Sequence, residues 1–363
     1  MATSVQDLPI VVYHYHASPY AKRVIWYLTL RKIPFSQCLQ PHVLPRPDVA
    51  ALGIAYRRIP LMSIGRDVYL DTRLILNKLE QLYPPSAAHP SLYSSVNPNQ
   101  DRALARLLLH RTMSVFMHAA RLLPAAVLSD PAFVRDRAAL VGIEIKSTGT
   151  DALASAPLAP ANIHKARPEA LVEAREVIAF LEETLLVDGR EWISSVELES
   201  GGRTTKGPSL VDIEAVWLWH WLHNIPGALS PEVIGKDAFP KVFAWIERFD
   251  AFMKEKTKEM GKVKTLGGDQ AAELIVRSSF AEPEAQVDGA DPVVVAEGFE
   301  KGQNVRLWPT DYGFLNKDEG MLVAMNKTEY VIETQGKFGS VRVHSPRLGF
   351  KISKSSGATA SKI

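Results

Sequence analysis

The segment from residue 10 to residue 79 restricts the possible folds more than any other part of the chain. An apolar run at residues 10–15 is followed by a turn that contains Pro19, and then by apolar residues at helical spacing up to Leu30. Proline is favoured at the first position of a helix, so this order predicts a strand, a turn and a helix. Further strands are predicted at residues 35–39, 58–64 and 68–70, and a helix follows up to Leu79. The segment therefore predicts an α/β domain.

Three motifs in this segment resemble those of glutathione transferases. Residues 18–24 begin Ser-Pro-Tyr and are similar to the Ser-Pro or Cys-Pro turn ahead of the first helix in that family. Residues 58–61, Arg-Ile-Pro-Leu, resemble the family's Lys-Ile/Val-Pro-Val segment, in which the proline is cis. Asp71-Thr72 takes the place of the family's acidic residue and serine. The resemblance covers residues 9–260 and implies a thioredoxin-like N-terminal domain followed by an all-helical domain.

The same resemblance implies which residues hold glutathione, the co-substrate of the family. Ile59, in front of a cis Pro60, would pair with the cysteinyl backbone of glutathione, and Arg58 would lie beside its glycyl carboxylate. Asp71 and Thr72 would hold the γ-glutamyl end. A carboxylate pairs with the γ-glutamyl ammonium group, and a hydroxyl at a helix N-terminus receives the γ-glutamyl carboxylate.

Ser18 is the predicted catalytic residue, because it alone occupies the motif position before proline. The nucleophile is the thiolate of glutathione, and lowering a thiol pKa by about two units takes about 2.7 kcal/mol. One hydrogen bond to a charged group supplies about 1.5–3 kcal/mol, so a single hydroxyl at a helix N-terminus nearly suffices. Two alternatives remain open. Ser18 could only cap the helix, or Tyr13, Tyr15 or Tyr20 could supply the hydroxyl, as a tyrosine near the first strand does in other classes of the family.

The residue type at position 18 also separates two kinds of chemistry. Relatives with cysteine there form a mixed disulfide with glutathione, which a hydroxyl cannot do. Cys38 is the one cysteine and lies on the predicted second strand, where a small buried apolar residue is expected. The resemblance therefore implies conjugation of glutathione, or a glutathione-dependent isomerisation or ring opening, rather than thiol exchange.

The sequence becomes helical after a linker rich in Ser, Ala, Pro and Asn that ends at Pro98. Ser209 and Asp212 have capping-box spacing and predict the start of a helix, and the resemblance implies that this is the central buried helix of the helical domain. Other helices are predicted at residues 99–122, 131–145, 169–186 and 239–256, with a loop or insertion at residues 146–168 and a polar loop at residues 197–207. A pocket for the electrophile could be lined by His110, Met113, Phe116, Met117 and residues 217–223, although aromatic and methionine residues at helical spacing more often form a core.

Residues 257–290 have the composition of a linker, and short β-like runs follow them from residue 293 to residue 352. Turn residues separate these runs at short intervals, which is typical of a small β-barrel or sandwich. The fold class predicted is therefore multidomain α/β plus all-α, with a thioredoxin-like domain at residues 9–85, a glutathione transferase-type helical domain at residues 95–260 and a small β-rich domain at residues 291–353. Because no predicted glutathione ligand lies beyond Thr72, the β-rich domain is expected to be dispensable for glutathione binding.

Composition and motifs limit the other possibilities. The net charge of +2 gives no reason to expect nucleic acid, and no apolar run approaches the ~20 residues that span a bilayer, so no membrane segment is predicted. We find no HExxH, CxxC, P-loop or GxGxxG motif, so no metal is predicted.

The sequence is thus expected to encode a cytoplasmic, homodimeric glutathione transferase that adds the sulfur of glutathione to a small apolar electrophile. The alternative is a non-catalytic protein, in which the transferase fold serves as an interaction module and the β-rich domain is the binding part.

Overall fold

The computed structural model of the chain describes residues 4–145, 153–200 and 203–355. The N-terminal part has the predicted thioredoxin-like order of strands and helices, and a short 3₁₀ turn, η1 (Val5–Asp7), precedes it. Strand β1 pairs with β2 in parallel and with β3 in antiparallel orientation, and β3 pairs with β4. The elements are β1 (Ile10–His14), α1 (Pro19–Leu30), β2 (Ser36–Leu39), α2 (Pro47–Ala50), β3 (Leu61–Ile64), β4 (Asp67–Leu70) and α3 (Thr72–Leu82).

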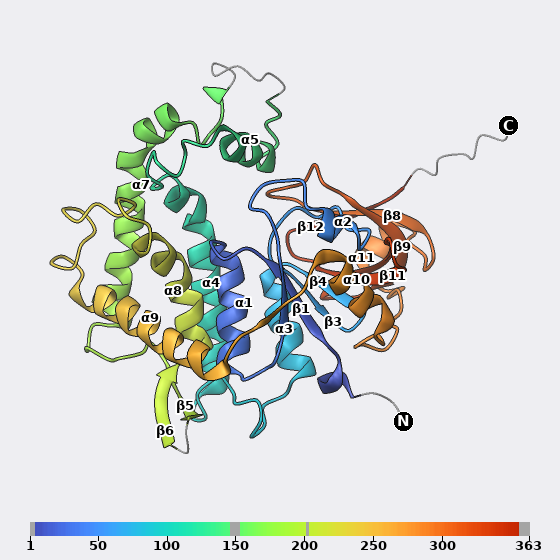
Figure 1. The fold of residues 1–363 in the computed structure, drawn as a ribbon, viewed down its shortest axis with the longest axis horizontal. Coiled ribbons are helices and arrows are strands. Elements are labelled where there is room, and N and C mark those ends of the chain that lie inside the picture. The colour runs from blue at the N-terminus through green and yellow to red at the C-terminus, as the bar shows by residue number, and fades with distance from the viewer. Residues whose placement is uncertain (1–3, 146–152, 201–202, 356–363) are drawn as a thin grey trace.

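The helical part packs on one side of this sheet, where it forms the left half of the molecule in Figure 1. Its central helix is buried on nearly every side and begins with the predicted capping box. The Ser209 hydroxyl accepts a hydrogen bond from the Val211 N–H (3.0 Å), and the Asp212 carboxylate accepts one from the Ser209 N–H (3.1 Å). The elements are α4 (Pro98–Ala120), α5 (Pro131–Leu140), α7 (Pro160–Phe180), the π-helical turn η2 (Leu181–Leu185), β5 (Ser195–Ser200), β6 (Arg203–Pro208), α8 (Leu210–His223) and α9 (Pro240–Met260).

The C-terminal part is confirmed as a β-sheet region, and its strands extend the N-terminal sheet. Strand β11 runs parallel to β4, with Val343 opposite Val68, and the complete ten-stranded sheet has the order β12-β8-β9-β10-β11-β4-β3-β1-β2-β7. Figure 1 shows these strands on the right of the molecule, beside the N-terminal strands. The elements are β7 (Lys264–Thr265), α10 (Gly268–Arg277), α11 (Pro292–Glu297), β8 (Asn304–Pro309), β9 (Asp318–Met325), β10 (Glu329–Gln335), β11 (Ser340–Pro346) and β12 (Phe350–Lys354).

Several predicted boundaries are wrong. Helix α7 starts at Pro160, inside the segment predicted as a loop, and continues through Pro168. Residues 197–200 and 203–207, predicted as parts of a polar loop, lie in the paired strands β5 and β6. The predicted linker at residues 257–290 contains α10, and β7 within it pairs with β2. Residues 146–152 of the predicted loop lie outside the described residues.

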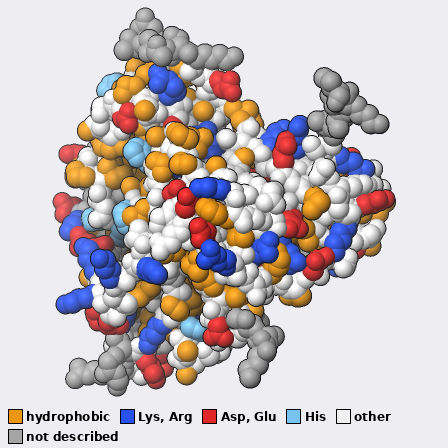
Figure 2. Space-filling model, turned by 45° about the vertical axis from the view of Figure 1, so that its right-hand side comes forward, with side chains coloured by type: hydrophobic (Ala, Val, Ile, Leu, Met, Phe, Trp, Pro, Cys, Tyr) orange, Lys and Arg blue, Asp and Glu red, His pale blue; other side chains and the backbone are white. Residues whose placement is uncertain are grey.

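Two hydrophobic clusters cover the two faces of the sheet. One joins α1 and α3 to the helical part, and the other joins α2 and α10 to the C-terminal strands. In the part of the chain that the structure describes, no helix is both long and apolar enough to cross a membrane. On the face shown in Figure 2, acidic and basic side chains are interspersed rather than gathered into one charged surface.

Candidate functional site

One cavity brings the predicted glutathione-binding residues together. It has a volume of about 590 Å³, and its wall includes residues from the N-terminal, helical and C-terminal parts of the chain. The segments that carry these residues are separated by up to 54 positions, from 18 to 72. They meet because the end of β1, the start of β3 and the start of α3 lie at the same edge of the N-terminal domain. The predicted residues on this wall are Ser18, Arg58, Ile59, Pro60, Asp71 and Thr72.

Ser18 lies at the start of α1, directly before Pro19 at the first helical position. Its hydroxyl oxygen accepts a hydrogen bond from the Ala21 N–H at 3.2 Å, so it caps the helix. A serine hydroxyl has one hydrogen to donate as well as two acceptor positions. The cap uses one acceptor position and leaves the O–H free to donate to a ligand, so capping and thiol activation are compatible at this residue.

The three tyrosines that compete with Ser18 differ in position. Tyr15 and Tyr20 line the cavity, whereas Tyr13 does not and is fully buried, with 0% of its surface exposed. Burial raises the pKa of Tyr13 well above its ordinary value, and its hydroxyl has no hydrogen-bond partner among the described residues. Burial also raises the pKa of Tyr20, whose ring packs against Phe116 and Trp217. Tyr13 therefore cannot reach a ligand in this cavity, while Tyr15 and Tyr20 can.

The peptide bond between Ile59 and Pro60 is cis, as the sequence motif predicts. Both residues lie on the cavity wall immediately before β3. A second cis bond, which the sequence analysis did not predict, joins Leu44 to Pro45 in the loop after β2.

Asp71 and Thr72 are already engaged by arginine side chains. The Asp71 carboxylate caps α3 and accepts hydrogen bonds from the Arg73 backbone N–H (2.9 Å), Nε (2.9 Å) and Nη2 (2.8 Å). Burial opposes ionisation of Asp71, but the hydrogen bonds and charge of Arg73 outweigh it and lower the pKa of Asp71. The Thr72 hydroxyl accepts a hydrogen bond from Arg23, which is buried and paired with Glu214 at 2.7 and 2.8 Å. The γ-glutamyl end of glutathione would thus meet groups that have internal partners.

Arg58 contacts the C-terminal part of the chain. Its guanidinium group donates to the Tyr312 carbonyl oxygen (Nε to O, 2.7 Å) and is paired with the Asp311 carboxylate. Asp311 and Tyr312 also line the cavity, and the next residue, Gly313, donates a backbone hydrogen bond to Leu140 at the end of α5. The loop between β8 and β9 therefore closes one side of the cavity. The C-terminal part thus contributes to the cavity wall, and no motif in the loop signals this. That the β-rich domain is dispensable for glutathione binding stays a prediction.

The rest of the wall is mainly apolar. Of the residues predicted for an electrophile pocket, Met113, Phe116, Met117 and Trp221 line the cavity. His110 does not line it, and Trp217 belongs to the buried core of the helical part. Helical spacing could not separate core residues from cavity residues, because α8 contributes Trp217 to the core and Trp221 to the cavity wall. The apolar wall residues that the sequence analysis missed include Leu123, Val127, Phe133, Leu140, Val141, Leu158 and Ile225.

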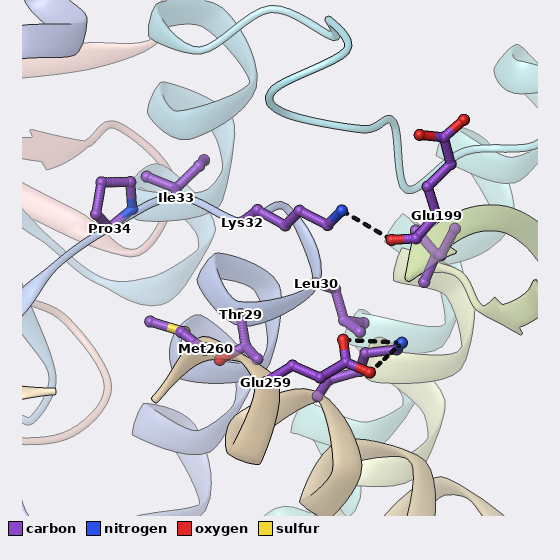
Figure 3. Close-up of a pocket in the computed structure, with 10 residues that line it drawn as sticks. Thr29, Leu30, Lys32, Ile33, Pro34, Glu199, Glu259 and Met260 are labelled. Carbon is purple, nitrogen blue, oxygen red and sulfur yellow. Dashed lines mark hydrogen bonds and ion pairs between the residues drawn. The ribbon is translucent and has the colours of Figure 1, made fainter. Parts of the chain in front are cut away.

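Two other places in the described chain have features of a site, and in both of them the lysine ammonium groups are already bound within the chain. A cavity of about 610 Å³ lies between the end of α1, β5 and the end of α9 (Figure 3). There the Lys32 ammonium group donates to the Glu199 carbonyl oxygen (2.7 Å), and Lys256 pairs with Glu259 (3.1 Å).

The second place is a cluster of Glu282, Glu329 and His344, whose potential ligand atoms lie within 4.8 Å of one another. The Lys78 ammonium group pairs with both glutamates at 2.6 and 2.8 Å, so it supplies the positive charge that a metal ion would bring. We therefore interpret this cluster as a structural ion-pair network.

Comparisons with known proteins agree with this architecture. Residues 12–87 match the sequence model of the glutathione S-transferase N-terminal domain, and residues 118–258 match that of a domain of unknown function (DUF7962). No curated protein matches the sequence.

Among solved structures, a GST-like protein from Pseudomonas syringae is similar to 96% of this chain and 99% of its own, with 21% identity and a TM-score of 0.58. Rice GST1 (OsGSTU1) in complex with glutathione is similar to 76% of this chain and 96% of its own, with 15% identity and a TM-score of 0.42. The first of these likenesses extends over the C-terminal strands as well. The chain therefore has the fold of glutathione transferase-like proteins, with an N-terminal domain of the glutathione S-transferase type, a helical domain and a C-terminal β-sheet region.

Proposed function

We propose that the protein is a glutathione transferase that activates the thiol of glutathione through Ser18 and adds its sulfur to a small apolar electrophile. The observation that supports this most directly is the convergence of Ser18, the Ile59–Pro60 segment and the Asp71–Thr72 helix start on one cavity whose remaining wall is mainly apolar. The polar end of the cavity suits the tripeptide glutathione, and its apolar end suits the electrophile.

In the proposed reaction, the glutathione S–H group lies at the N-terminus of α1. The Ser18 hydroxyl donates a hydrogen bond to the thiolate, and the positive end of the α1 dipole stabilises the same charge. The thiol proton leaves to water, the thiolate sulfur forms a bond to the electrophilic carbon, and the electron pair of the bond that breaks moves to the leaving group. An isomerisation or a ring opening would use the same activated sulfur.

Disulfide exchange does not fit the cysteine of this chain. Cys38 is buried on β2, does not line the cavity, and its Sγ lies 3.7 Å from a carboxylate oxygen of Asp48. Burial and the charge of Asp48 raise the pKa of Cys38 to about 12, so its reactive thiolate form is scarce at neutral pH. This supports conjugation chemistry rather than thiol transfer.

A non-catalytic interaction module is the second candidate, and two observations favour it. Asp71 is paired with Arg73, and Arg58 is paired with Asp311, so both charged ends of the predicted glutathione site are neutralised within the chain. Glutathione must exchange these partners when it binds. A protein that no longer binds glutathione has no need of free charges there.

Retention of the full chain on immobilised glutathione, followed by thiol consumption with a nitro-activated aryl chloride, separates the two candidates. We expect retention that free glutathione reverses, and consumption above the rate without protein. A folded chain that shows neither would support the interaction module. Our proposal includes a homodimer and a cytoplasmic location, for which light scattering at micromolar concentration and imaging of the tagged chain are the respective tests.

A further inference from the structure

The charged residues of the cavity do not balance. Arg58 is paired with Asp311, and the Asp71 carboxylate is paired with Arg73. Asp130 is exposed and caps α5 through the Ala132 N–H (2.8 Å). Besides these two pairs and Asp130, the cavity wall contains three further guanidinium groups, those of Arg46, Arg57 and Arg137.

These three arginines, which we call the arginine cluster, share one carboxylate. Arg57 lies 2.9 Å from a carboxylate oxygen of Asp136, and Arg137 pairs with the other oxygen of the same group. Arg46 forms no ion pair among the described residues. The group of side chains therefore has an excess of two positive charges if all are ionised.

Backbone carbonyl groups fix the cluster in place. Arg46 donates to the carbonyl oxygens of Pro41 (3.0 Å), His42 (3.3 Å) and Arg57, and Arg137 donates to that of His42 (3.0 Å). Burial lowers the pKa of Arg46. Tyr15 and Asp136 oppose this effect, and repulsion from Arg137 and Arg57 adds to it. Because buried like charges are costly, an anion bound here would relieve the repulsion.

The surroundings of the cluster indicate the kind of anion. The Arg137 guanidinium group stacks over the Phe133 ring at 4.5 Å from its centroid, and its Nη2 lies 3.5 Å from the Tyr15 hydroxyl. Phe133 continues into the apolar wall formed by Leu140, Leu158 and Ile225. An apolar surface that ends at a planar guanidinium group suits a flat apolar ligand with a carboxylate at one end.

We propose that the arginine cluster is the anion-binding end of this cavity and takes the carboxylate of the ligand, with Arg137 as its accessible member. This inference rests on the proposed function for the identity of the reaction, and it refines the expected electrophile from simply apolar to apolar with an acidic group. The same carboxylate could belong instead to the glycyl end of glutathione, and the experiment below separates the two sources.

The test compares 2-naphthoate with the neutral amide 2-naphthamide on the full chain, by titration of tryptophan fluorescence, since Trp221 lines the cavity. We expect the acid to bind about tenfold more tightly than the amide, and Arg137→Gln to reduce that ratio to about threefold or less. Arg135→Gln is the matched control, because Arg135 lies on the same helix but does not line the cavity, and it should leave the ratio unchanged.

Glutathione and its glycyl ethyl ester identify the source of the carboxylate. If saturating glutathione leaves naphthoate binding intact, the cluster serves the second substrate. If glutathione competes and its ester does not, the cluster serves the glycyl carboxylate. Either result supports the anion-binding end.

Equal affinities for acid and amide in the natural protein would overturn the inference, as would an unchanged ratio in folded Arg137→Gln. Should Arg137→Gln fail to fold, the salt dependence of the natural protein decides, because salt must weaken naphthoate binding and spare naphthamide binding. Absence of glutathione binding in every variant would overturn the proposed function, while the naphthoate ratio would still decide the inference separately.

Discussion

Ser18 caps α1 through its side-chain oxygen and also lines the cavity. Its proposed role in catalysis therefore has to be tested apart from its contribution to stability. We predict that Ser18→Ala lowers the turnover of glutathione conjugation by about tenfold or more, since the hydroxyl acts on the thiolate. Glutathione affinity should stay within a few-fold, and loss of the cap should cost about 1 kcal/mol of stability. Steady-state kinetics and calorimetry provide the two measurements.

Ser18→Thr is the control for this prediction, because it keeps a hydroxyl and a cap. It should retain most of the turnover that Ser18→Ala loses. Undiminished turnover in Ser18→Ala would transfer the role to Tyr15 or Tyr20, the two tyrosines on the cavity wall.

Asp311 would compete with glutathione for Arg58 under the proposed function, because its carboxylate pairs with the guanidinium group that the glycyl carboxylate is expected to contact. We predict that Asp311→Asn raises glutathione affinity by about two- to fivefold, because an ion pair whose Asp311 side chain is 42% exposed is worth at most about 1 kcal/mol. Calorimetric titration of the full chain measures this gain.

Asp311→Glu keeps the charge and should not produce the gain. A weaker affinity in Asp311→Asn would mean that Asp311 orients Arg58 for glutathione instead of competing with it.

At the scale of elements, the sequence predicted best where local signals and packing agree. The turn before α1 and the capping box of α8 combine a helix-start signal with an apolar stripe, and both begin at the expected residue. The run Val293-Val294-Val295 was predicted as a strand from its β-branched residues, but it forms α11. Asp291 caps that helix at Val293 N–H (2.9 Å), Pro292 occupies its first turn, and Gly298 ends it in the left-handed conformation.

Helix α7 and the Arg58 contact show what the sequence could not provide. Proline usually starts or breaks a helix, yet Pro168 lies inside α7, where Ile163 on one side of it and Ala170 on the other are buried. Packing against neighbouring helices outweighs the local signal there. The partner of Arg58 could not be predicted from the sequence either, because Asp311 lies 253 positions away in a loop without a motif.

The junction of β4 with β11 contains a buried ion-pair network that should make stability depend on pH. His344 contacts Asp67 at 3.0 Å and Glu329 at 3.1 Å, and Lys78, Glu282 and the Tyr69 ring surround the same group. Burial opposes protonation of His344, but the hydrogen bonds to Asp67 and Glu329 and their charges outweigh it and raise the pKa of His344 to about 9.

We predict that this contribution is complete below about pH 6.5, the ordinary pKa of histidine, and is lost as the pH rises through about 9. His344→Gln should therefore lower the free energy of unfolding by about 3 kcal/mol near pH 6, and by much less at pH 9.5. Urea unfolding of both proteins across this range gives the difference. A constant difference from pH 6 to pH 9.5 would show that His344 is not protonated in the native state. His223→Gln, in a histidine outside the network, is the control.

At the scale of the whole molecule, the C-terminal strands and the N-terminal domain share one sheet and one hydrophobic cluster. Further bonds join them, since the Asp318 carboxylate accepts the backbone N–H groups of Ala55 (2.6 Å) and Tyr56 (2.9 Å), and the Thr334 hydroxyl donates to the Leu52 carbonyl oxygen (3.1 Å). The predicted division of the chain at residue 291 therefore crosses a continuous structure. We infer that the two parts unfold together.

Hydrogen exchange in a core variant of β11 tests this coupling. Val343 is fully buried and lies opposite Val68 across the junction, so Val343→Ala should destabilise the sheet by about 2 kcal/mol. If the sheet opens as one cooperative unit, mass-spectrometric exchange should accelerate by a similar factor in β10 and β11 and in β3 and β4 of the N-terminal domain.

Val134→Ala is the matched control, because Val134 is equally apolar and buried but belongs to a small cluster around α5, away from the sheet. It should leave exchange in β3 and β4 unchanged. Faster exchange confined to β8–β12 in Val343→Ala would mean that the C-terminal strands open on their own. In that case the C-terminal strands form a separate unit that docks on the transferase fold. A chain without these strands should then keep its cavity, except for the part of the wall that Asp311 and Tyr312 form.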